Sequence, residues 1–355
     1  MQRLRKEILL TLLLAVVLLL LPAPKAQAEE FPHVSAAAAV VMSGDGEVVF
    51  EKNADQRTLV ASTTKLLTAL VTVESCALDE ELDILPEWTE VEGSSMYLQA
   101  GERYSVRDLL EGLLLASGND AATALACHVA GGTAAFAERM NRRARELGMQ
   151  NSHFVNPHGL DEEGHYATAR DLGRLMAACV QDRRLAPLLA ETSAIVKEQT
   201  YVNHNRLLAL CPGCIGGKTG YTAAAGRCLV SGCEREGTRL ICVTLDDPND
   251  WVDHQVLYNW AFSRYCTRDV TAGLAFEVPV VSGDRTLLRV EARPLRLFLP
   301  RTAEITLTAH LPRFVFAPVT AGESAGTVQV FRNGERINEA ELIYREGAAV
   351  AAERR

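Results

Sequence analysis

The sequence has none of the compositions that mark a disordered, fibrous or disulfide-stapled chain. Charged residues make up 23% of its 355 residues, Gly (25) and Pro (13) are at ordinary levels, and low-complexity tracts and internal repeats are absent. These observations exclude intrinsic disorder and collagen-like structure. The nine cysteines are scattered along the chain, which excludes a small disulfide scaffold. At roughly 100–200 residues per domain, the chain can bury two hydrophobic cores, or three.

No apolar run reaches the ~20 residues that a helix needs to cross a bilayer. Residues 8–21 are apolar apart from one threonine, and the tripeptide A-Q-A at 26–28 supplies a cleavage site. A basic start precedes the apolar run and consists of Arg3, Arg5 and Lys6. We therefore interpret residues 1–28 as a secretory signal peptide, which predicts a secreted, extracytoplasmic protein of the cell envelope. An uncleaved membrane anchor is the alternative.

An excess of positive charge is also missing. The formal net charge is −9, and removal of the predicted signal peptide brings it to about −12, because that segment carries four cations and one carboxylate. Such a surface repels phosphate backbones and anionic headgroups, so we exclude nucleic acid as a partner. Beyond the signal segment we expect no membrane association, because the tail after Tyr344 has no wide apolar face.

What the chain does contain is helix and strand patterning in a clear order. The expected strands are 37–42, 47–51, 228–231, 240–244, 286–291, 305–311 and 327–331, and the expected helices are 62–73, 109–115, 120–129, 133–147 and 250–262. Asn333-Gly334 is a strong signal for a type I′ hairpin turn. These patterns predict a mixed α and β domain of about 240 residues followed by a small all-β domain.

Ser62-Thr63-Thr64-Lys65 is an S-x-x-K sequence at the start of a predicted helix. A three-residue step returns to the same helical face, so we expect the Lys65 ammonium beside the Ser62 hydroxyl. A lysine whose pKa is lowered can take the serine proton and so activate a nucleophile. The motif is weak alone, because a surface Ser and Lys on a helix would give the same letters.

Two further short motifs carry suitable groups. The tripeptide S-G-N at 117–119 lies between two predicted helices, where a hydroxyl and an amide could relay a proton and bind a peptide carbonyl. The tripeptide K-T-G at 218–220 precedes a predicted strand and offers a cation and a hydroxyl to a carboxylate. Its glycine would let substrate backbone approach closely. Each motif is weak alone, since turns commonly use these residues.

Together the three motifs are far more specific. Ser117 follows Ser62 by 55 residues and Lys218 follows Ser117 by 101. Helix start, interhelix loop and strand are the settings in which serine penicillin-recognising enzymes carry S-x-x-K, S-x-N and K-T-G. Over residues 32–345 the sequence resembles that superfamily, and most of all the D-alanyl-D-alanine carboxypeptidases, which are low-molecular-mass penicillin-binding proteins. Further similar stretches are 61–65, 115–120, 156–161, 165–171, 203–205 and 217–222.

The resemblance implies an α+β fold and a substrate. A β-lactamase/transpeptidase-like catalytic domain, with an antiparallel sheet flanked by helices, is expected at 29–272, a small β-sandwich-like domain at 273–345 and a tail at 346–355. The implied enzyme is a serine-type hydrolase that removes the terminal D-alanine from the peptidoglycan stem pentapeptide through an acyl-enzyme and so limits cross-linking. β-Lactam antibiotics would be covalent inhibitors. The scheme needs no cofactor and no metal.

The resemblance also assigns the catalytic roles. Ser62 is the nucleophile, Lys65 is its general base, and Ser117 relays protons toward the leaving amine. Asn119 orients the substrate or Lys65.

The substrate-binding residues follow from the third motif. Lys218 and Thr219 would bind the terminal carboxylate, and Lys218 would also help to keep Lys65 deprotonated. Gly220 would let the substrate backbone approach, and the backbone N–H of Tyr221 would form the oxyanion hole with that of Ser62.

Two other functions are compatible with parts of the pattern. A non-catalytic penicillin sensor or wall-binding protein could use the same fold, although all motif residues are intact. A class A β-lactamase would usually carry S-D-N and a glutamate between the second and third motifs. This chain instead has Gly118 and no E-x-x-L-N sequence.

The cysteines leave several arrangements open. Cys211 and Cys214, followed by Cys228 and Cys233, loosely resemble a four-cysteine zinc spacing. One or more disulfides near the third motif are favoured over zinc, and Cys228 with Cys242 across adjacent strands is another possible pair.

The histidines point to no catalytic site. Neither H-E-x-x-H nor G-x-S-x-G is present. We therefore expect structural hydrogen-bonding roles for His158, His165 and His204.

Overall fold

The computed structural model describes residues 31–351. The predicted signal peptide therefore lies outside the described residues. The chain from Val34 onward forms one compact unit.

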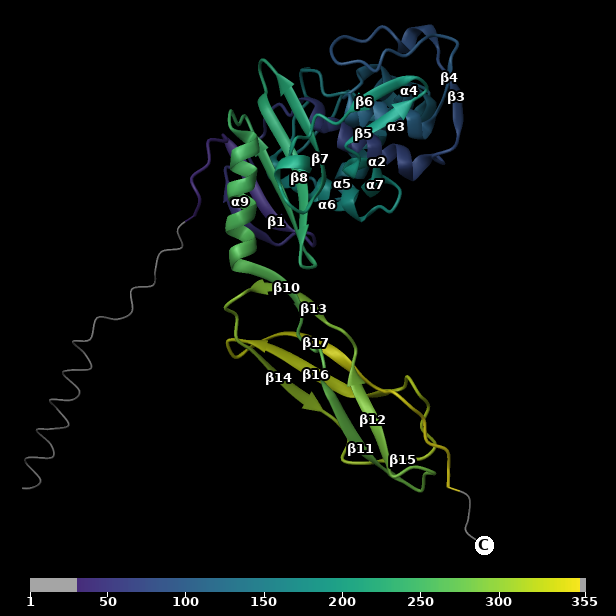
Figure 1. The fold of residues 1–355 in the computed structure, drawn as a ribbon, viewed down its shortest axis with the longest axis vertical. Coiled ribbons are helices and arrows are strands. Elements are labelled where there is room, and N and C mark those ends of the chain that lie inside the picture. The colour runs from purple at the N-terminus through teal and green to yellow at the C-terminus, as the bar shows by residue number, and fades with distance from the viewer. Residues whose placement is uncertain (1–30, 352–355) are drawn as a thin grey trace, which may run out of the picture. The chain divides into compact units, whose positions relative to one another are not determined.

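A five-stranded antiparallel sheet forms the centre of the region that carries the three motifs (Figure 1). Its strand order is β2-β1-β9-β8-β7. The strands are β1 (Ala38–Ser43), β2 (Val48–Lys52), β7 (Cys214–Thr222), β8 (Gly226–Arg235) and β9 (Thr238–Leu245). The strand β7, which contains the K-T-G sequence, is therefore an edge strand of this sheet.

The two faces of this sheet are covered by different helices. Alternate residues of β8 point to opposite sides, so Val230 joins a large core with helices α2 to α7, whereas Leu229 joins a smaller core with α9. The helices of the larger core are α2 (Lys65–Ser75), α3 (Val106–Leu115), α4 (Asn119–Ala130), α5 (Thr133–Glu146), α6 (Ala169–Gln181) and α7 (Leu185–Ala190). The smaller core lies under α9 (Asp250–Arg264) and includes residues of the short α8 (Leu207–Leu210).

Short elements complete this region. The 3₁₀ turn η1 (Ala61–Thr64) leads into α2, and η2 (Pro86–Trp88) lies in the segment before α3. Two small antiparallel hairpins pair β3 (Glu81–Asp83) with β4 (Arg103–Ser105) and β5 (Ser193–Val196) with β6 (Gln199–Val202). The helix expected at 109–115 begins earlier, at Val106, because Ser105 and Asp108 form a reciprocal capping box.

The residues after α9 form β-sheets only. β10 (Tyr265–Asp269) pairs with β13 (Arg296–Pro300), and a six-stranded sheet has the order β14-β16-β17-β12-β11-β15. Its strands are β11 (Ala275–Val281), β12 (Leu287–Ala292), β14 (Ile305–His310), β15 (Val315–Phe316), β16 (Ser324–Arg332) and β17 (Glu335–Tyr344). A separate core that includes Val278, Leu288 and Val328 supports it. Asn333 and Gly334 both have positive φ, 52° and 85°, as a type I′ turn between β16 and β17 requires.

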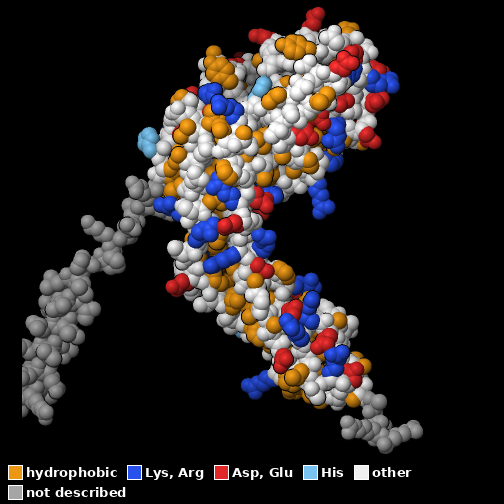
Figure 2. Space-filling view, viewed as in Figure 1, with side chains coloured by type: hydrophobic (Ala, Val, Ile, Leu, Met, Phe, Trp, Pro, Cys, Tyr) orange, Lys and Arg blue, Asp and Glu red, His pale blue; other side chains and the backbone are white. Residues whose placement is uncertain are grey.

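The fold class is therefore confirmed: a helix-flanked antiparallel sheet is followed by an all-β region. Among the described residues no helix is both long and apolar enough to cross a membrane. Acidic and basic side chains are interspersed on the face shown in Figure 2, without a continuous basic surface.

The structure corrects the cysteine interpretations. All nine cysteines are free thiols, so within residues 31–351 no disulfide braces the third motif. Cys228 belongs to the larger core and Cys242 to the smaller one, on the opposite side of the sheet, so these two cannot pair across the strands. The same placement separates Cys228 from Cys211 and Cys233, which rules out the four-cysteine zinc site.

Candidate active site

Ser62 and Lys65 lie where η1 passes into α2. Lys65 Nζ donates a hydrogen bond to Ser62 Oγ at 2.9 Å. The predicted proximity is thus observed, although the turn that holds Ser62 is a 3₁₀ turn and not regular α-helix. Ala61 begins it with a positive φ of 45°, a strained conformation for a residue with a Cβ atom. The backbone therefore presents Ser62 at a fixed angle to the helix.

The Lys65 side chain is completely buried and fully hydrogen-bonded. Besides Ser62, its Nζ donates to Asn119 Oδ1 at 2.6 Å and to the His158 carbonyl oxygen at 2.7 Å. Burial, and next the charge of Lys218, hold the pKa of Lys65 well below its usual range. A lysine with a depressed pKa can be neutral near physiological pH, which is the state in which it accepts a proton.

Ser117 and Lys218 form a second serine–lysine pair. Ser117 lies in the connection from α3 to α4 with a φ of 62°, and Lys218 Nζ donates to its Oγ at 3.0 Å. A second hydrogen bond runs from this Nζ to the Thr219 carbonyl oxygen at 2.8 Å. Burial lowers the pKa of Lys218 to about 7. The second and third motifs are therefore in direct contact.

Asn119 connects the site to a loop that sequence reasoning missed. Its backbone N–H donates to the Ser94 carbonyl at 2.7 Å, and its Nδ2 donates to the Glu92 carbonyl at 2.5 Å. The next residue, Asp120, is buried and accepts hydrogen bonds from the backbone N–H groups of Met96 and Leu98, both at 3.0 Å. The start of α4 therefore holds this loop, and with it Ser94, against the site.

Two glycines allow the backbone to close around Ser62. A Cβ atom at Gly220 would lie 3.0 Å from the Ser62 backbone nitrogen, so β7 passes directly against that N–H. A Cβ atom at Gly159, whose φ is 86°, would lie 1.9 Å from the Ala61 carbonyl oxygen. The Gly159 position therefore requires glycine, and at Gly220 a side chain would press against the backbone of the Ser62 turn.

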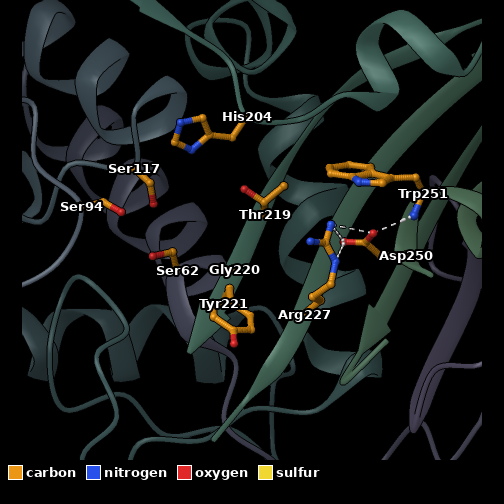
Figure 3. A pocket seen from close by; sticks show the side chains of 10 residues that line it. All are labelled: Ser62, Ser94, Ser117, His204, Thr219, Gly220, Tyr221, Arg227, Asp250 and Trp251. Carbon is orange, nitrogen blue, oxygen red and sulfur yellow. Dashed lines mark hydrogen bonds and ion pairs between the residues drawn. The ribbon is translucent and has the colours of Figure 1, made fainter. Parts of the chain in front are cut away.

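Residues from all three motifs line a cleft of about 320 Å³. Figure 3 shows Ser62, Ser94 and Ser117 on one side of the cleft and Thr219 of β7 facing them. The other lining residues are His204, Gly220, Tyr221, Arg227, Asp250 and Trp251. Tyr221 is 69% exposed. Lys65 and Lys218 are not part of the lining, but both donate hydrogen bonds to residues that are, Lys65 to Ser62 and Lys218 to Ser117 and Thr219.

Arg227 is a cationic lining residue that the motif search did not find. Its Nε and Nη2 donate to both carboxylate oxygens of Asp250 at 2.9–3.1 Å, and its guanidinium lies 5.6 Å from the centre of the Trp251 ring. Figure 3 shows this pair at the end of the cleft beyond Thr219. Nothing in the local sequence marks Arg227, because its neighbours come from β7 and from the start of α9.

The sequence predicts structural roles for His158, His165 and His204, and the structure supports them for His158 and His165. His165 Nε2 contacts Thr64 Oγ1 at 2.9 Å, and burial lowers the pKa of His165 to about 4. Burial and the Lys65 charge also lower the pKa of His158 to about 4. His204 differs, because it lines the cleft. A neutral imidazole is the form that these environments favour.

Comparison with known proteins gives a consistent family assignment. The model of the D-alanyl-D-alanine carboxypeptidase family, Peptidase_S11, matches residues 25–249. D-alanyl-D-alanine carboxypeptidase DacF of Bacillus subtilis is 29% identical to this chain, over 96% of the chain and 94% of the relative. DacC of Escherichia coli is 33% identical, over 90% and 86% respectively.

A solved structure shares the fold over most of the chain. Penicillin-binding protein 5 from Haemophilus influenzae superposes with a TM-score of 0.71 at 28% identity, covering 90% of this chain and 99% of that one. The match extends past α9, and so includes strands of the C-terminal sheets.

Proposed function

Because this chain belongs to the D-alanyl-D-alanine carboxypeptidase family, and is thus a serine peptidase of the penicillin-binding type that acts on peptidoglycan, we propose that Ser62, Lys65 and Ser117 carry its reaction. The observation that supports this most strongly is the 2.9 Å hydrogen bond between Lys65 Nζ and Ser62 Oγ. A general base must be within hydrogen-bond reach of the proton it takes, and must be neutral when it does so. Lys65 meets the first condition, and its depressed pKa favours the second.

In the acylation step Ser62 Oγ attacks the carbonyl carbon of the penultimate D-alanine. Its proton passes to the neutral Lys65 Nζ. The developing oxyanion accepts hydrogen bonds from the backbone N–H groups of Ser62 and Tyr221. The close approach of Gly220 to the Ser62 nitrogen supports this role, because it brings β7 against the Ser62 turn. Such preorganised donors are each worth about 3–4 kcal/mol in other acyl-transfer enzymes.

Collapse of the tetrahedral intermediate breaks the peptide bond and releases D-alanine. The proton that Lys65 took from Ser62 passes to the D-alanine amine through the Ser117 hydroxyl, which faces the cleft and accepts a hydrogen bond from Lys218. Lys65 is then neutral again. Water attacks the ester carbonyl and gives a proton to Lys65, which returns it to Ser62 Oγ as the acyl product leaves. Asn119 keeps Lys65 in place throughout, because its Oδ1 accepts from Nζ.

The terminal carboxylate of the substrate binds at the other end of the cleft. Thr219 offers its hydroxyl there, Lys218 contributes positive potential from beneath, and Arg227 offers a guanidinium. A guanidinium can hold a carboxylate by two parallel hydrogen bonds. Arg227 Nη2 already donates a hydrogen bond to Asp250 Oδ1. This ion pair fixes the orientation of the guanidinium and so the direction of its remaining N–H groups.

The wider setting is also part of the proposal. Residues 29–272 form the catalytic domain and 273–345 a small β domain, which its separate core supports. The stem pentapeptide is the substrate, and β-lactams acylate Ser62. The signal peptide directs the protein across the cytoplasmic membrane, and the remaining chain is extracytoplasmic.

The test is covalent labelling joined to product release. The wild-type protein is expected to react with a fluorescent penicillin and to release D-alanine from a diacylated L-Lys-D-Ala-D-Ala peptide, and Ser62→Ala is expected to do neither. Absence of label at Ser62 would contradict the proposal. Labelling without D-alanine release would favour the penicillin sensor, and rapid hydrolysis of the penicillin itself would indicate a β-lactamase.

A further inference from the structure

Three side chains that can bind metals meet at the end of α2 opposite to Lys65. Cys76 is the C-cap residue of α2, Glu80 lies in the connection that follows, and His128 lies near the end of α4. One ligand atom of each lies within 4.8 Å of the other two. Within residues 31–351 no other trio of His, Cys, Asp or Glu side chains meets this condition. The cluster is separate from the catalytic cleft, whose lining includes none of these residues.

The backbone holds these three residues in place. The Cys76 N–H donates to the Thr72 carbonyl at 2.9 Å, which closes the last turn of α2. The Glu80 carbonyl accepts a hydrogen bond from the Val106 N–H at 2.8 Å. The segment from Cys76 to Glu80 is therefore attached to the start of α3. His128 Nε2 and Glu80 Oε1 are 2.8 Å apart. These hydrogen bonds therefore hold the thiol of Cys76, the carboxylate of Glu80 and the imidazole of His128 close together.

We propose that Cys76, Glu80 and His128 form a zinc site that joins the C-terminal ends of α2 and α4, with water as the fourth ligand. Thiolate, imidazole and carboxylate are the three ligand types that Zn²⁺ uses in proteins. Bonds of about 2.0–2.3 Å in a tetrahedron place ligand atoms roughly 3.3–3.8 Å apart, so small side-chain rotations suffice. Mg²⁺ and Ca²⁺ are poor candidates, since they prefer oxygen ligands throughout.

Charge and proton balance also favour Zn²⁺. Burial and the nearby Glu80 charge raise the pKa of the Cys76 thiol, so without metal Cys76 is a neutral thiol. Zn²⁺ displaces the thiol proton, and the thiolate and carboxylate together cancel the charge of the ion. Binding of Zn²⁺ to Cys76 as a thiolate therefore releases the thiol proton.

The site would brace the helices that hold the catalytic base. α2 begins at Lys65 and α4 begins at Asn119, and these two side chains are hydrogen-bonded at 2.6 Å. A metal at the far ends of both helices would fix their relative position at a second point.

The experiment is calorimetric titration of zinc into the metal-stripped protein, reduced with a phosphine. In buffers of different ionisation enthalpy at pH 8, we expect one equivalent to bind with a Kd of about 10 µM or tighter, with release of about one proton. Cys76→Ser and His128→Gln should each weaken binding at least about tenfold. Cys127→Ser is the matched control: it removes a neighbouring thiol that lies by the Thr133 backbone, and should leave binding unchanged.

Two further readouts distinguish zinc at Cys76 from zinc at another thiol or from a folding defect. Co²⁺ in place of zinc should give a thiolate-to-cobalt absorption band that is lost in Cys76→Ser. Circular dichroism of each metal-free variant checks that it folds. No binding of one equivalent overturns the proposal, and so does binding that survives Cys76→Ser, since that would place the metal at thiols such as Cys211 or Cys214.

Discussion

Lys65 and Lys218 are both buried, and each holds a different serine hydroxyl, Ser62 at 2.9 Å and Ser117 at 3.0 Å. The charge of Lys218 is also one of the causes that depress the pKa of Lys65. The two lysines therefore have distinct tasks: Lys65 is more often neutral, and so available as a base, because Lys218 is charged nearby.

Replacement of Lys65 by arginine tests its role as a base. A guanidinium keeps the positive charge at any pH that the protein survives, so it cannot accept a proton from Ser62. Lys65→Arg should therefore lower kcat/KM for D-alanine release at least about 100-fold, even if its Tm changes little. Lys52→Arg makes the same exchange on β2, away from the cleft, and should retain wild-type kcat/KM. Substantial activity in Lys65→Arg would rule out Lys65 as the base.

The pH profile of kcat/KM should depend on Lys218. Activity requires neutral Lys65, so it rises with pH as Lys65 loses its proton. Removal of the neighbouring cation in Lys218→Gln stabilises protonated Lys65 and raises its pKa, so the acidic limb of the profile should move to higher pH. If the maximum kcat/KM falls while the acidic limb stays at the same pH, the two lysines are not coupled.

Burial of Lys218 also affects stability. Its pKa is lowered to about 7 from an unfolded value of 10.5, so between these pH values the unfolded chain binds more protons than the folded one. The contribution of Lys218 to the free energy of unfolding therefore increases as pH rises from 7 toward 10.5. Lys218→Met removes this group, and its Tm relative to the wild type should be higher at pH 6 than at pH 9. An equal Tm difference at both pH values would contradict burial of a titrating lysine.

Gly159 and Gly148 form a matched pair of left-handed glycines. Gly148→Ala adds a methyl group in open space, at a φ of 76°, and should cost only the backbone penalty of about 1–2 kcal/mol. Gly159→Ala places its Cβ 1.9 Å from the Ala61 carbonyl and must displace the turn that holds Ser62. We expect a larger loss of unfolding free energy for Gly159→Ala, with a loss of penicillin acylation rate that Gly148→Ala does not show. Similar losses in both variants would contradict the contact.

Arg227 should act in substrate binding and little in the chemical step. Arg227→Gln removes the guanidinium, and we expect KM for a peptide with a free C-terminal carboxylate to rise about 10–100-fold while kcat changes much less. The exchange Arg239→Gln on the neighbouring strand is the control. If the wild type binds a C-terminally amidated peptide as well as the free acid, Arg227 has no such role.

Local chemistry made some of this structure predictable. The contact of Ser62 with Lys65 follows from a three-residue step on one face of a helical turn. The Asn333-Gly334 hairpin is equally local, since both residues tolerate positive φ.

Contacts between distant elements were not predictable in this way. Arg227 reaches the cleft because β8 is paired beside β7 and α9 begins nearby, which no single window of sequence reveals. The Cys228–Cys242 pairing was wrong because the register places Ser231 opposite Cys242. That register puts the two thiols on different faces, and strand identity without register cannot supply it.

The position of β7 at the end of the five-stranded sheet has a consequence for selectivity. An edge strand leaves alternate main-chain N–H and C=O groups free on its outer side, and here that side borders the Ser62 turn. An extended peptide can add to such an edge through its own main chain, whatever its side chains are. Recognition of the chain direction and of the carboxyl end can then be achieved by geometry common to all peptides. Side-chain variation in a peptide bound in this way would leave those main-chain contacts intact.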